Sequence, residues 1–351
     1  MKYSRVYIDA IGYELPPVVV TSRELESRLG RLYETLHLPH GQLEALTGIS
    51  ERRWWDPGFL LSDGASAAAK HALESSNVEP NDLEVLIYAG VCRELFEPAT
   101  ACKVAANVGV NPGAAVFDVS NACLGVLNGM VEIANRIELG QARAGMVVSC
   151  ETAREINDIM IDKMLESPTM ETFKYSLATL TGGSGAVAVL LTDGSFSSEK
   201  RRKLLGGVTQ TAPQFHNLCR WGIEALHQIP LTHYFSQFIS TDSAAVLKNG
   251  VELGTRTWVA FLTKLGWVGD QIDKVICHQV GSGHRDSILK TLGIDESKEF
   301  NTYPYLGNIG TVSLPITAAL AEDRDFLKPG DRVAFLGIGS GLNCLMLGLE
   351  W

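Results

Sequence analysis

The sequence lacks a long hydrophobic run. None of its 351 residues belong to a stretch with the roughly 18 uncharged positions that a membrane-spanning helix needs. The N-terminal segment MKYSRVYIDAIGYELPP also has no apolar core of the kind found in signal peptides. These absences argue against a membrane span and predict a cytoplasmic protein. The composition, 46% hydrophobic and 20% charged, is typical of a folded globular chain.

Paired cysteines and an excess of positive charge are lacking too. The seven cysteines include no CxxC pair and lie mostly in apolar contexts, which predicts reduced thiols and no structural zinc site. The net charge is −10, whereas binding to a phosphate backbone needs a basic surface, so nucleic acid is not an expected partner. The glycine-rich segments TGGSGA and LGIGSGLN lack a Walker lysine and a following βαβ unit, so they are interpreted as tight turns around a site.

The sequence contains an internal repeat of about half its length. A helical segment leads into the strand-like VLIYAG in the first half, and another leads into VICHQV in the second, so that Val85 and Val275 correspond at a separation of 190 residues. Two later β-rich segments put Ala144 and Arg332 188 residues apart. Similar offsets in the same order predict two copies of an α/β unit, each with a buried sheet covered by helices.

The repeat suggests a division of the chain into residues 1–195 and 196–351. Each half contains an irregular stretch, at about 154–181 and 210–245, with Met and aromatic residues at partly helical spacing. Such residues most often belong to an ordinary core. As insertions in a duplicated core, however, these stretches are where the shape of a substrate pocket would be set.

Cys123 lies where a buried strand ending near Val119 turns into an apolar helix that is expected to begin at about Cys123. Unpaired N–H groups and the helix dipole at such a position favour the nucleophilic thiolate, and the same N–H groups can hold an oxyanion. A cysteine among small residues can equally be a core residue. A partner base or donor would decide between these two interpretations.

Two polar residues of the second half are candidate partners. His278 ends a short apolar strand, and in a duplicated fold it could face Cys123 from the other half, although histidines at strand ends usually bond to the backbone. Asn308 lies between glycines, where asparagine is often a turn former. The spacing of His278 and His284 does not favour a metal site. A Cys, a His and an Asn in this order form a known kind of nucleophile and donor set.

Six motifs in one order make the chain resemble the ketoacyl-ACP synthase III branch of the thiolase superfamily: TGISERRW, SNACLGVLNGM, GGSGA, CHQV, GNIGTVSLP and LGIGSGLNC. The resemblance covers nearly the whole chain. It implies an α/β thiolase fold with duplicated halves in a five-layer αβαβα arrangement, and a homodimer. It implies no metal and no cofactor, with coenzyme A thioester as substrate.

Within that branch the chain is similar to the OleA type, which joins two fatty acyl chains head to head. The finer match lies in FEPATA, NLCR, STDS and GNIG. The resemblance implies that Cys123 carries the first acyl group and that His278 and Asn308 donate hydrogen bonds to thioester or enolate oxygen. The backbone N–H groups of Cys123 and Ser340 would then line an oxyanion hole.

Glu97 separates this chemistry from that of the synthases. A malonyl donor forms its carbanion by losing carbon dioxide, whereas a simple acyl-CoA must lose an α-proton to a base. In the OleA pattern the glutamate of the EPAT segment reaches from the partner subunit into the site as that base, which implies this role for Glu97. A solvated loop charge is the alternative interpretation.

Other positions depart from the synthase pattern. Gln42 and Leu46 stand near the places where a Trp and an Arg usually grip the CoA nucleotide, so Arg52 and Arg53 are the candidates for that contact. VGSG follows the HQ motif in place of a basic residue, which leaves the use of an acyl carrier protein open. Downstream pathway enzymes are further expected partners.

The sequence therefore predicts an acyltransferase that condenses two acyl-CoA molecules to a β-keto acid without decarboxylation. Two alternatives stay open. One is a decarboxylating 3-oxoacyl-ACP synthase III that uses malonyl-ACP, and the other is acyl transfer from Cys123 to an oxygen or nitrogen nucleophile. A non-catalytic dimer subunit is disfavoured by the complete Cys-His-Asn set.

Overall fold

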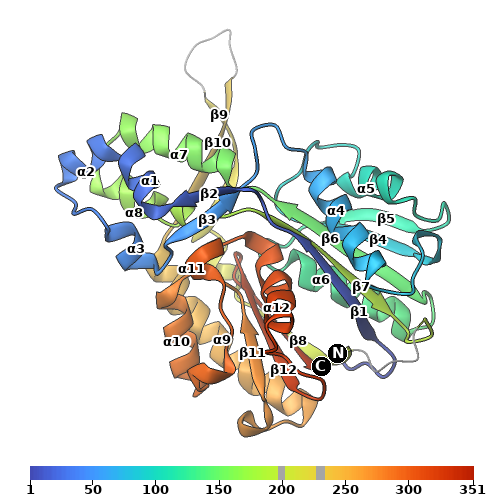
Figure 1. Ribbon diagram of the computed structural model, residues 1–351. Helices are drawn as coiled ribbons and strands as arrows, with labels where there is room; N and C mark the ends of the chain where they lie inside the picture. The colour runs from blue at the N-terminus through green and yellow to red at the C-terminus, as the bar shows by residue number, and fades with distance from the viewer. Residues whose placement is uncertain (197–201, 227–233) are drawn as a thin grey trace.

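The fold is organised around one mixed sheet, nine-stranded in the computed structural model, which describes residues 1–196, 202–226 and 234–351 (Figure 1). The strand order is β11-β12-β13-β8-β1-β7-β6-β4-β5. The strands span β1 (Tyr7–Glu14), β4 (Val85–Ala89), β5 (Ala115–Val119), β6 (Ala144–Glu151), β7 (Gly185–Thr192), β8 (Arg202–Thr211), β11 (Lys274–Cys277), β12 (Arg332–Gly339) and β13 (Asn343–Glu350).

The two parts of this sheet repeat one pairing pattern. In the first half, β4 pairs parallel with β6, β6 pairs antiparallel with β7, and β7 pairs antiparallel with β1. In the second half, β11 pairs parallel with β12, β12 pairs antiparallel with β13, and β13 pairs antiparallel with β8. Val85 and Val275 lie in the equivalent strands β4 and β11, and Ala144 and Arg332 open the equivalent β6 and β12. The predicted duplication is confirmed. The division expected after residue 195 lies next to residues 197–201, outside the described residues, and stays a prediction.

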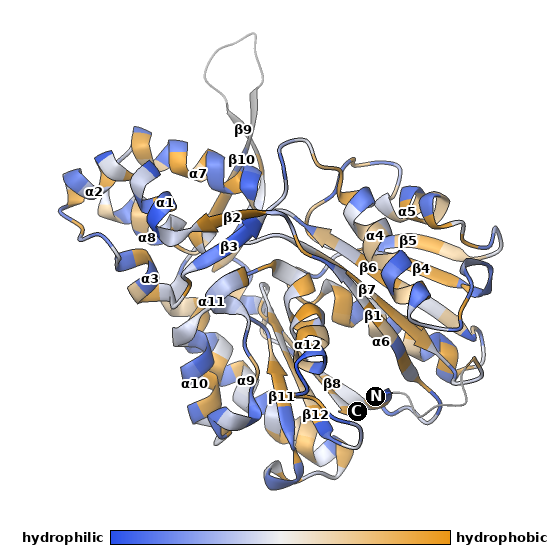
Figure 2. Cartoon of the chain, viewed as in Figure 1, coloured by the Kyte–Doolittle hydropathy of each residue, from blue (hydrophilic) through white to orange (hydrophobic). Residues whose placement is uncertain are grey.

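Helices cover and separate the two parts of the sheet, which gives the five layers. The helices concerned are α4 (Leu61–Glu74) and α5 (Thr100–Val108), α6 (Gly125–Glu138) and α12 (Ser313–Asp323), and α9 (Ser243–Leu265) and α10 (Ser282–Leu292). One core joins α6 and α12 to strands of both halves, while α4 with α5 and α9 with α10 each pack on one outer face. The strands between these layers are largely hydrophobic (Figure 2), because helices cover both of their faces.

A smaller lobe of helices and hairpins lies at one end of the sheet. Its elements are β2 (Val18–Thr21), α1 (Ser22–Arg28), α2 (Gly30–Leu36), α3 (Gln42–Thr47), β3 (Glu51–Trp54), α7 (Arg154–Glu166) and α8 (Met170–Ser176). The stretch at 154–181 is therefore mainly helical rather than irregular, because its apolar residues pack with α1 to α3 into a separate core. The hairpin of β9 (Cys219–Leu226) and β10 (Tyr234–Thr241) extends from this lobe, away from the sheet (Figure 1).

None of the helices in the three described stretches of the chain is both long and apolar enough to cross a bilayer.

Candidate active site

A cavity of about 760 Å³ brings together four of the residues singled out from the sequence. Cys123 enters from the first half of the chain, and His278, Asn308 and Ser340 enter from the second. Each lies in a turn at the end of a strand or short helix, where the backbone is free to present a side chain or an N–H group. The structure thus brings the Cys-His-Asn set together, while the chemical role of each member stays a prediction.

Cys123 lies in a tight turn between β5 and α6. Ala122 has a left-handed backbone (φ 45°), and Leu124 N–H donates to the Asn121 carbonyl at 2.9 Å. Since a left-handed residue cannot continue a right-handed helix, α6 begins only at Gly125. The expected helix start at Cys123 is therefore two residues too early, and the thiol precedes the helix.

The pKa of Cys123 is shifted opposite to the expectation. Burial raises it to about 12, and the nearby Cys219 and Glu151 add to the rise. The helix-start N–H groups compensate little because they are already bonded; Val126 N–H, for example, donates to Thr311 Oγ1 at 2.8 Å. Without substrate, Cys123 is a neutral thiol at pH 7.

His278 follows β11 and is held by Ser313, the first residue of α12. Its Nδ1 lies 2.8 Å from Ser313 Oγ, which also accepts the backbone N–H of Gln279 at 3.3 Å. Within the described residues, the Ser313 hydroxyl has one hydrogen-bond acceptor, the Nδ1 atom of His278. Because Nδ1 accepts this proton, the hydrogen of the neutral imidazole is on Nε2. Burial, with a contribution from His284, lowers the pKa of His278 to about 4. At neutral pH the ring is thus an uncharged donor.

Asn308 sits between α11 (Tyr303–Leu306) and the 3₁₀ turn Gly310–Val312, in a loop fixed by backbone hydrogen bonds. Its N–H donates to the Thr181 carbonyl at 2.9 Å, and its carbonyl accepts Gly183 N–H at 3.0 Å. Its side-chain Oδ1 accepts Gly310 N–H at 3.1 Å. With the oxygen occupied, the amide N–H₂ remains as the group that can donate to a substrate oxygen.

Ser340 lies in the turn between β12 and β13, next to the cysteine turn. A Cβ added to the preceding Gly339 would lie 3.4 Å from the Cys123 backbone nitrogen. The two backbones therefore approach closely, as two N–H groups that share one oxyanion must.

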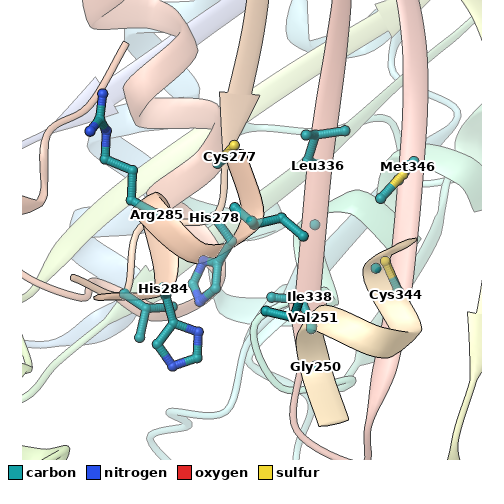
Figure 3. A pocket seen from close by; sticks show the side chains of 14 residues that line it. Gly250, Val251, Cys277, His278, His284, Arg285, Leu336, Ile338, Cys344 and Met346 are labelled. Atoms are coloured by element: carbon teal, nitrogen blue, oxygen red, sulfur yellow. The ribbon is translucent and has the colours of Figure 1, made fainter. Parts of the chain in front are cut away.

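A second, smaller cavity of about 50 Å³ lies behind the histidine (Figure 3). Its walls come from α9, α10 and β11 to β13, and it shares His278, Val280, His284 and Ile338 with the main cavity. Both histidines line this space (Figure 3). His278 and His284 thus separate the main cavity from an apolar recess.

Glu97 does not line the cavity of its own chain. It is exposed in the loop between β4 and α5, beside Leu95 and Phe96. Glu97 is therefore not part of the site in its own chain, and its role as a base stays a prediction.

The expected nucleotide contact of Arg52 is wrong. Arg52 is fully buried, and its guanidinium donates to the Val20 and Leu180 carbonyls and to Ser22 Oγ. These bonds tie β3 into the helical lobe, and full burial of the side chain keeps a ligand from reaching it. Arg53 donates to the Pro16 carbonyl and lies outside the cavity walls, and a contact between it and substrate stays untested.

Sequence reasoning missed two residues that shape the site, Glu151 and Ser313. Glu151 ends β6 in the cavity wall, where its carboxylate accepts the N–H groups of Val91 at 3.1 Å and Cys92 at 3.2 Å. Burial raises its pKa. The available signal was an acidic residue at the end of the apolar run MVVSCE, and for Ser313 its place in GNIGTVSLP.

Sequence comparisons identify the relatives of this chain. The family described as 3-oxoacyl-[acyl-carrier-protein (ACP)] synthase III C terminal matches residues 262–351. An acyl-CoA:acyl-CoA alkyltransferase of Shewanella oneidensis is 57% identical over 354 residues, covering all of both chains. The acyl-CoA:acyl-CoA alkyltransferase of Xanthomonas campestris is 35% identical, again over all of both chains.

Solved structures of Xanthomonas campestris OleA share the fold. The cerulenin-bound form is 35% identical with a TM-score of 0.92 and covers 100% of this chain and 98% of that one. A cysteine-to-serine variant with bound lauric acid and lauroyl-CoA is 34% identical with a TM-score of 0.91, covering 99% of this chain and all of that one. Because full-length identity of this level accompanies the same fold, the chain belongs to the OleA family of acyl-CoA:acyl-CoA alkyltransferases, thiolase-fold acyltransferases related to ketoacyl synthase III.

Proposed function

We propose that this chain catalyses the non-decarboxylative Claisen condensation of two fatty acyl-CoA molecules to a β-keto acid. The observation that carries the proposal is the convergence of Cys123, His278 and Asn308 on one cavity of about 760 Å³. The relatives named acyl-CoA:acyl-CoA alkyltransferase support it, as does the lauroyl-CoA bound to one OleA variant. Coenzyme A thioester enters as substrate, and the chemistry needs no metal or other cofactor.

The first step is acylation of Cys123. Its sulfur attacks the thioester carbon of the first acyl-CoA, the carbon–sulfur bond to coenzyme A breaks, and the thiol proton passes to the departing CoA sulfur. Because the pKa of Cys123 is about 12, its attack on the thioester depends on stabilisation of the developing oxyanion rather than on a thiolate formed before substrate binds. The backbone N–H groups of Cys123 and Ser340 are the proposed donors to this oxyanion.

The second step is condensation. A base removes the α-proton of the second acyl-CoA, and the enolate oxygen accepts hydrogen bonds from His278 Nε2–H and Asn308 Nδ2–H. The α-carbon then attacks the acyl-cysteine carbonyl, the bond to Cys123 sulfur breaks, and the proton returns to that sulfur. Water hydrolyses the remaining CoA thioester to give the free β-keto acid. A neutral His278 is suited to this because its Nε2–H can donate a hydrogen bond to the enolate oxygen while the imidazole ring stays uncharged.

Glu97 of a second copy of the chain is the proposed base. Strand β5 is an edge of the sheet, and edge strands present unpaired backbone groups to a partner. The adjoining loop exposes 91% of Phe96 and 59% of Leu95, which monomeric surfaces rarely do for neighbouring large apolar residues. A homodimer formed at this edge would bury them and carry Glu97 toward the partner's cavity.

Coenzyme A must also be held at the cavity entrance. Among the described lining residues Arg220 is the one arginine, and its side chain is exposed. A guanidinium there can pair with a phosphate of the nucleotide. Arg220 therefore replaces Arg52 as the proposed nucleotide contact.

The decisive experiment is intact-protein mass spectrometry of wild type, Cys123→Ala and Glu97→Gln with decanoyl-CoA and no malonyl donor, together with analysis of the released product. We expect an acyl adduct on wild type and on Glu97→Gln, β-keto product from wild type only, and no adduct on Cys123→Ala. The Glu97→Gln change removes the base and keeps the size of the side chain, so acylation should persist.

Other results would redirect the proposal. An adduct that yields product only after malonyl-ACP is added would identify a decarboxylating synthase, and one released only by an alcohol or amine would identify acyl transfer to oxygen or nitrogen. Normal turnover by Glu97→Gln would remove the base assignment.

A further inference from the structure

The two N–H groups that are proposed to bind the thioester oxygen belong to different halves of the molecule. Cys123 lies in the turn before α6, and Ser340 lies in the turn between β12 and β13. Within the described stretches no backbone hydrogen bond joins these turns. Something other than the sheet must therefore fix their separation, since an oxyanion is stabilised by both donors only when each lies about 2.7–3.1 Å from it.

The side chain of Asn343 joins the two turns. It opens β13, and its Nδ2 donates to Asn121 Oδ1 at 3.1 Å and to the Ser340 carbonyl at 3.3 Å. Asn121 is two residues before the nucleophile and donates its own amide to Asn128 Oδ1 at 2.8 Å, in α6. A chain of three amides thus runs from the hairpin of the second half, through the cysteine turn, into the helix of the first half.

The hairpin turn is shaped around this amide. Gly341 has φ 130°, and a Cβ there would lie 2.6 Å from Asn343 Nδ2. Only a glycine leaves this space open, so the turn and the amide fit each other. Both amide hydrogens of Asn343 are used, one in the bond across the gap to Asn121 and one in the bond within the hairpin to the Ser340 carbonyl.

We propose that Asn343 is a positioning residue that holds the backbone N–H groups of Cys123 and Ser340 at the separation needed to bind one thioester oxygen. The inference rests on the proposed acylation of Cys123 and adds to it a residue that touches neither substrate nor sulfur. Asn121 is its partner, and loss of either side chain breaks the same link.

The test compares two reactions of one sulfur atom. Acylation by decanoyl-CoA develops an oxyanion, whereas alkylation by iodoacetamide displaces iodide and develops none. Displacement of Cys123 or misfolding of the protein would slow both reactions, whereas displacement of an oxyanion donor slows only acylation. The ratio of the two rate constants, measured at Cys123 by peptide mass spectrometry in single-turnover experiments, therefore isolates the positioning effect.

We expect Asn343→Ala to lower the acylation rate about 10- to 100-fold, the range for a displaced catalytic group, with alkylation within about twofold of wild type. Asn121→Ala should change the ratio similarly. The double variant should lower the ratio no further than either single variant, because each of the three variants breaks the same hydrogen bond between Asn343 and Asn121. Asn249→Ala is the matched control, since Asn249 is partly buried and its side chain, among the described residues, bonds within α9, to the Ala245 carbonyl.

Equal loss of both reactions, or an unchanged ratio in Asn343→Ala, would overturn the inference. If Asn343→Ala does not fold, the ratio in Asn121→Ala decides the question in the same way. Wild-type Cys123 that takes no acyl group would reject the proposed function itself, whereas acylated wild type with unchanged ratios in the variants would reject the positioning role alone.

Discussion

Cys123 shows how strongly one residue depends on its surroundings. The same thiol that a helix start would activate is a poor nucleophile when enclosed by apolar walls, because burial disfavours the charged form. Glu151, a carboxylate in the same cavity wall, adds to the effect. Burial therefore favours the protonated thiol of Cys123 when no substrate is bound.

The raised pKa of Cys123 predicts a pH dependence of its reactivity. With a pKa of about 12, the thiolate fraction of Cys123 rises about tenfold per pH unit across the neutral range. Iodoacetamide alkylation of Cys123 in substrate-free protein should accordingly keep rising from pH 7 to pH 10 without a plateau. Stopped samples analysed by peptide mass spectrometry would measure it, with Cys123→Ala to identify the peptide. A plateau below pH 9 would show that the thiol is activated in the free enzyme.

At the scale of elements, the loop that carries Asn308 is held by the glycine segment before β7. Gly182 and Asn308 form an isolated parallel bridge, and Gly183 packs directly on the loop. A Cβ on Gly183 would lie 2.1 Å from the Leu306 carbonyl oxygen, a backbone atom that cannot rotate away. This close approach explains why position 183 is a glycine.

Gly183→Ala should therefore disturb the loop and Asn308 with it. We expect a loss of about 1–3 kcal/mol in the free energy of unfolding, the usual range for overpacking, measured by urea denaturation. Condensation should fall more than Cys123 alkylation does. The control is Gly30→Ala at the start of α2, where a Cβ meets nothing within 4 Å. Equal stabilities for the two variants would contradict the tight packing.

At the scale of the whole molecule, the proposed role of Glu97 as the base requires a second copy of the chain. Cys123, His278 and Asn308 lie in one chain's cavity, whereas Glu97 lies on an exposed loop beside the edge strand β5. Sharing a site across a twofold axis makes each subunit supply a base to the other.

Shared sites predict complementation between inactive variants. Dimers of Cys123→Ala with Glu97→Gln contain one complete site, formed by Cys123 of one chain and Glu97 of the other. Random mixing of equal amounts makes about half of the dimers mixed, so about a quarter of wild-type condensation should return. Co-expression with two affinity tags and a product assay would measure it. No recovery in purified mixed dimers would mean that Glu97 does not act across the interface.

Much of this protein was determined by its sequence alone. The repeat that relates Val85 to Val275 predicted the duplicated α/β fold, because buried strands and amphipathic helices leave their periodicity in local sequence. The order of Cys123, His278 and Asn308 predicted the residues that meet in the cavity, since strand ends in equivalent halves converge.

Only the tertiary structure decided the rest. It placed Arg52 in the core and Arg220 at the cavity, turned the pKa of Cys123 upward, and revealed Ser313 and Asn343 as supports of the site. Each of these depends on burial or on contacts between residues far apart in the chain. Desolvation and hydrogen-bond geometry are set by what surrounds a group in space, and neighbours in the sequence do not specify that.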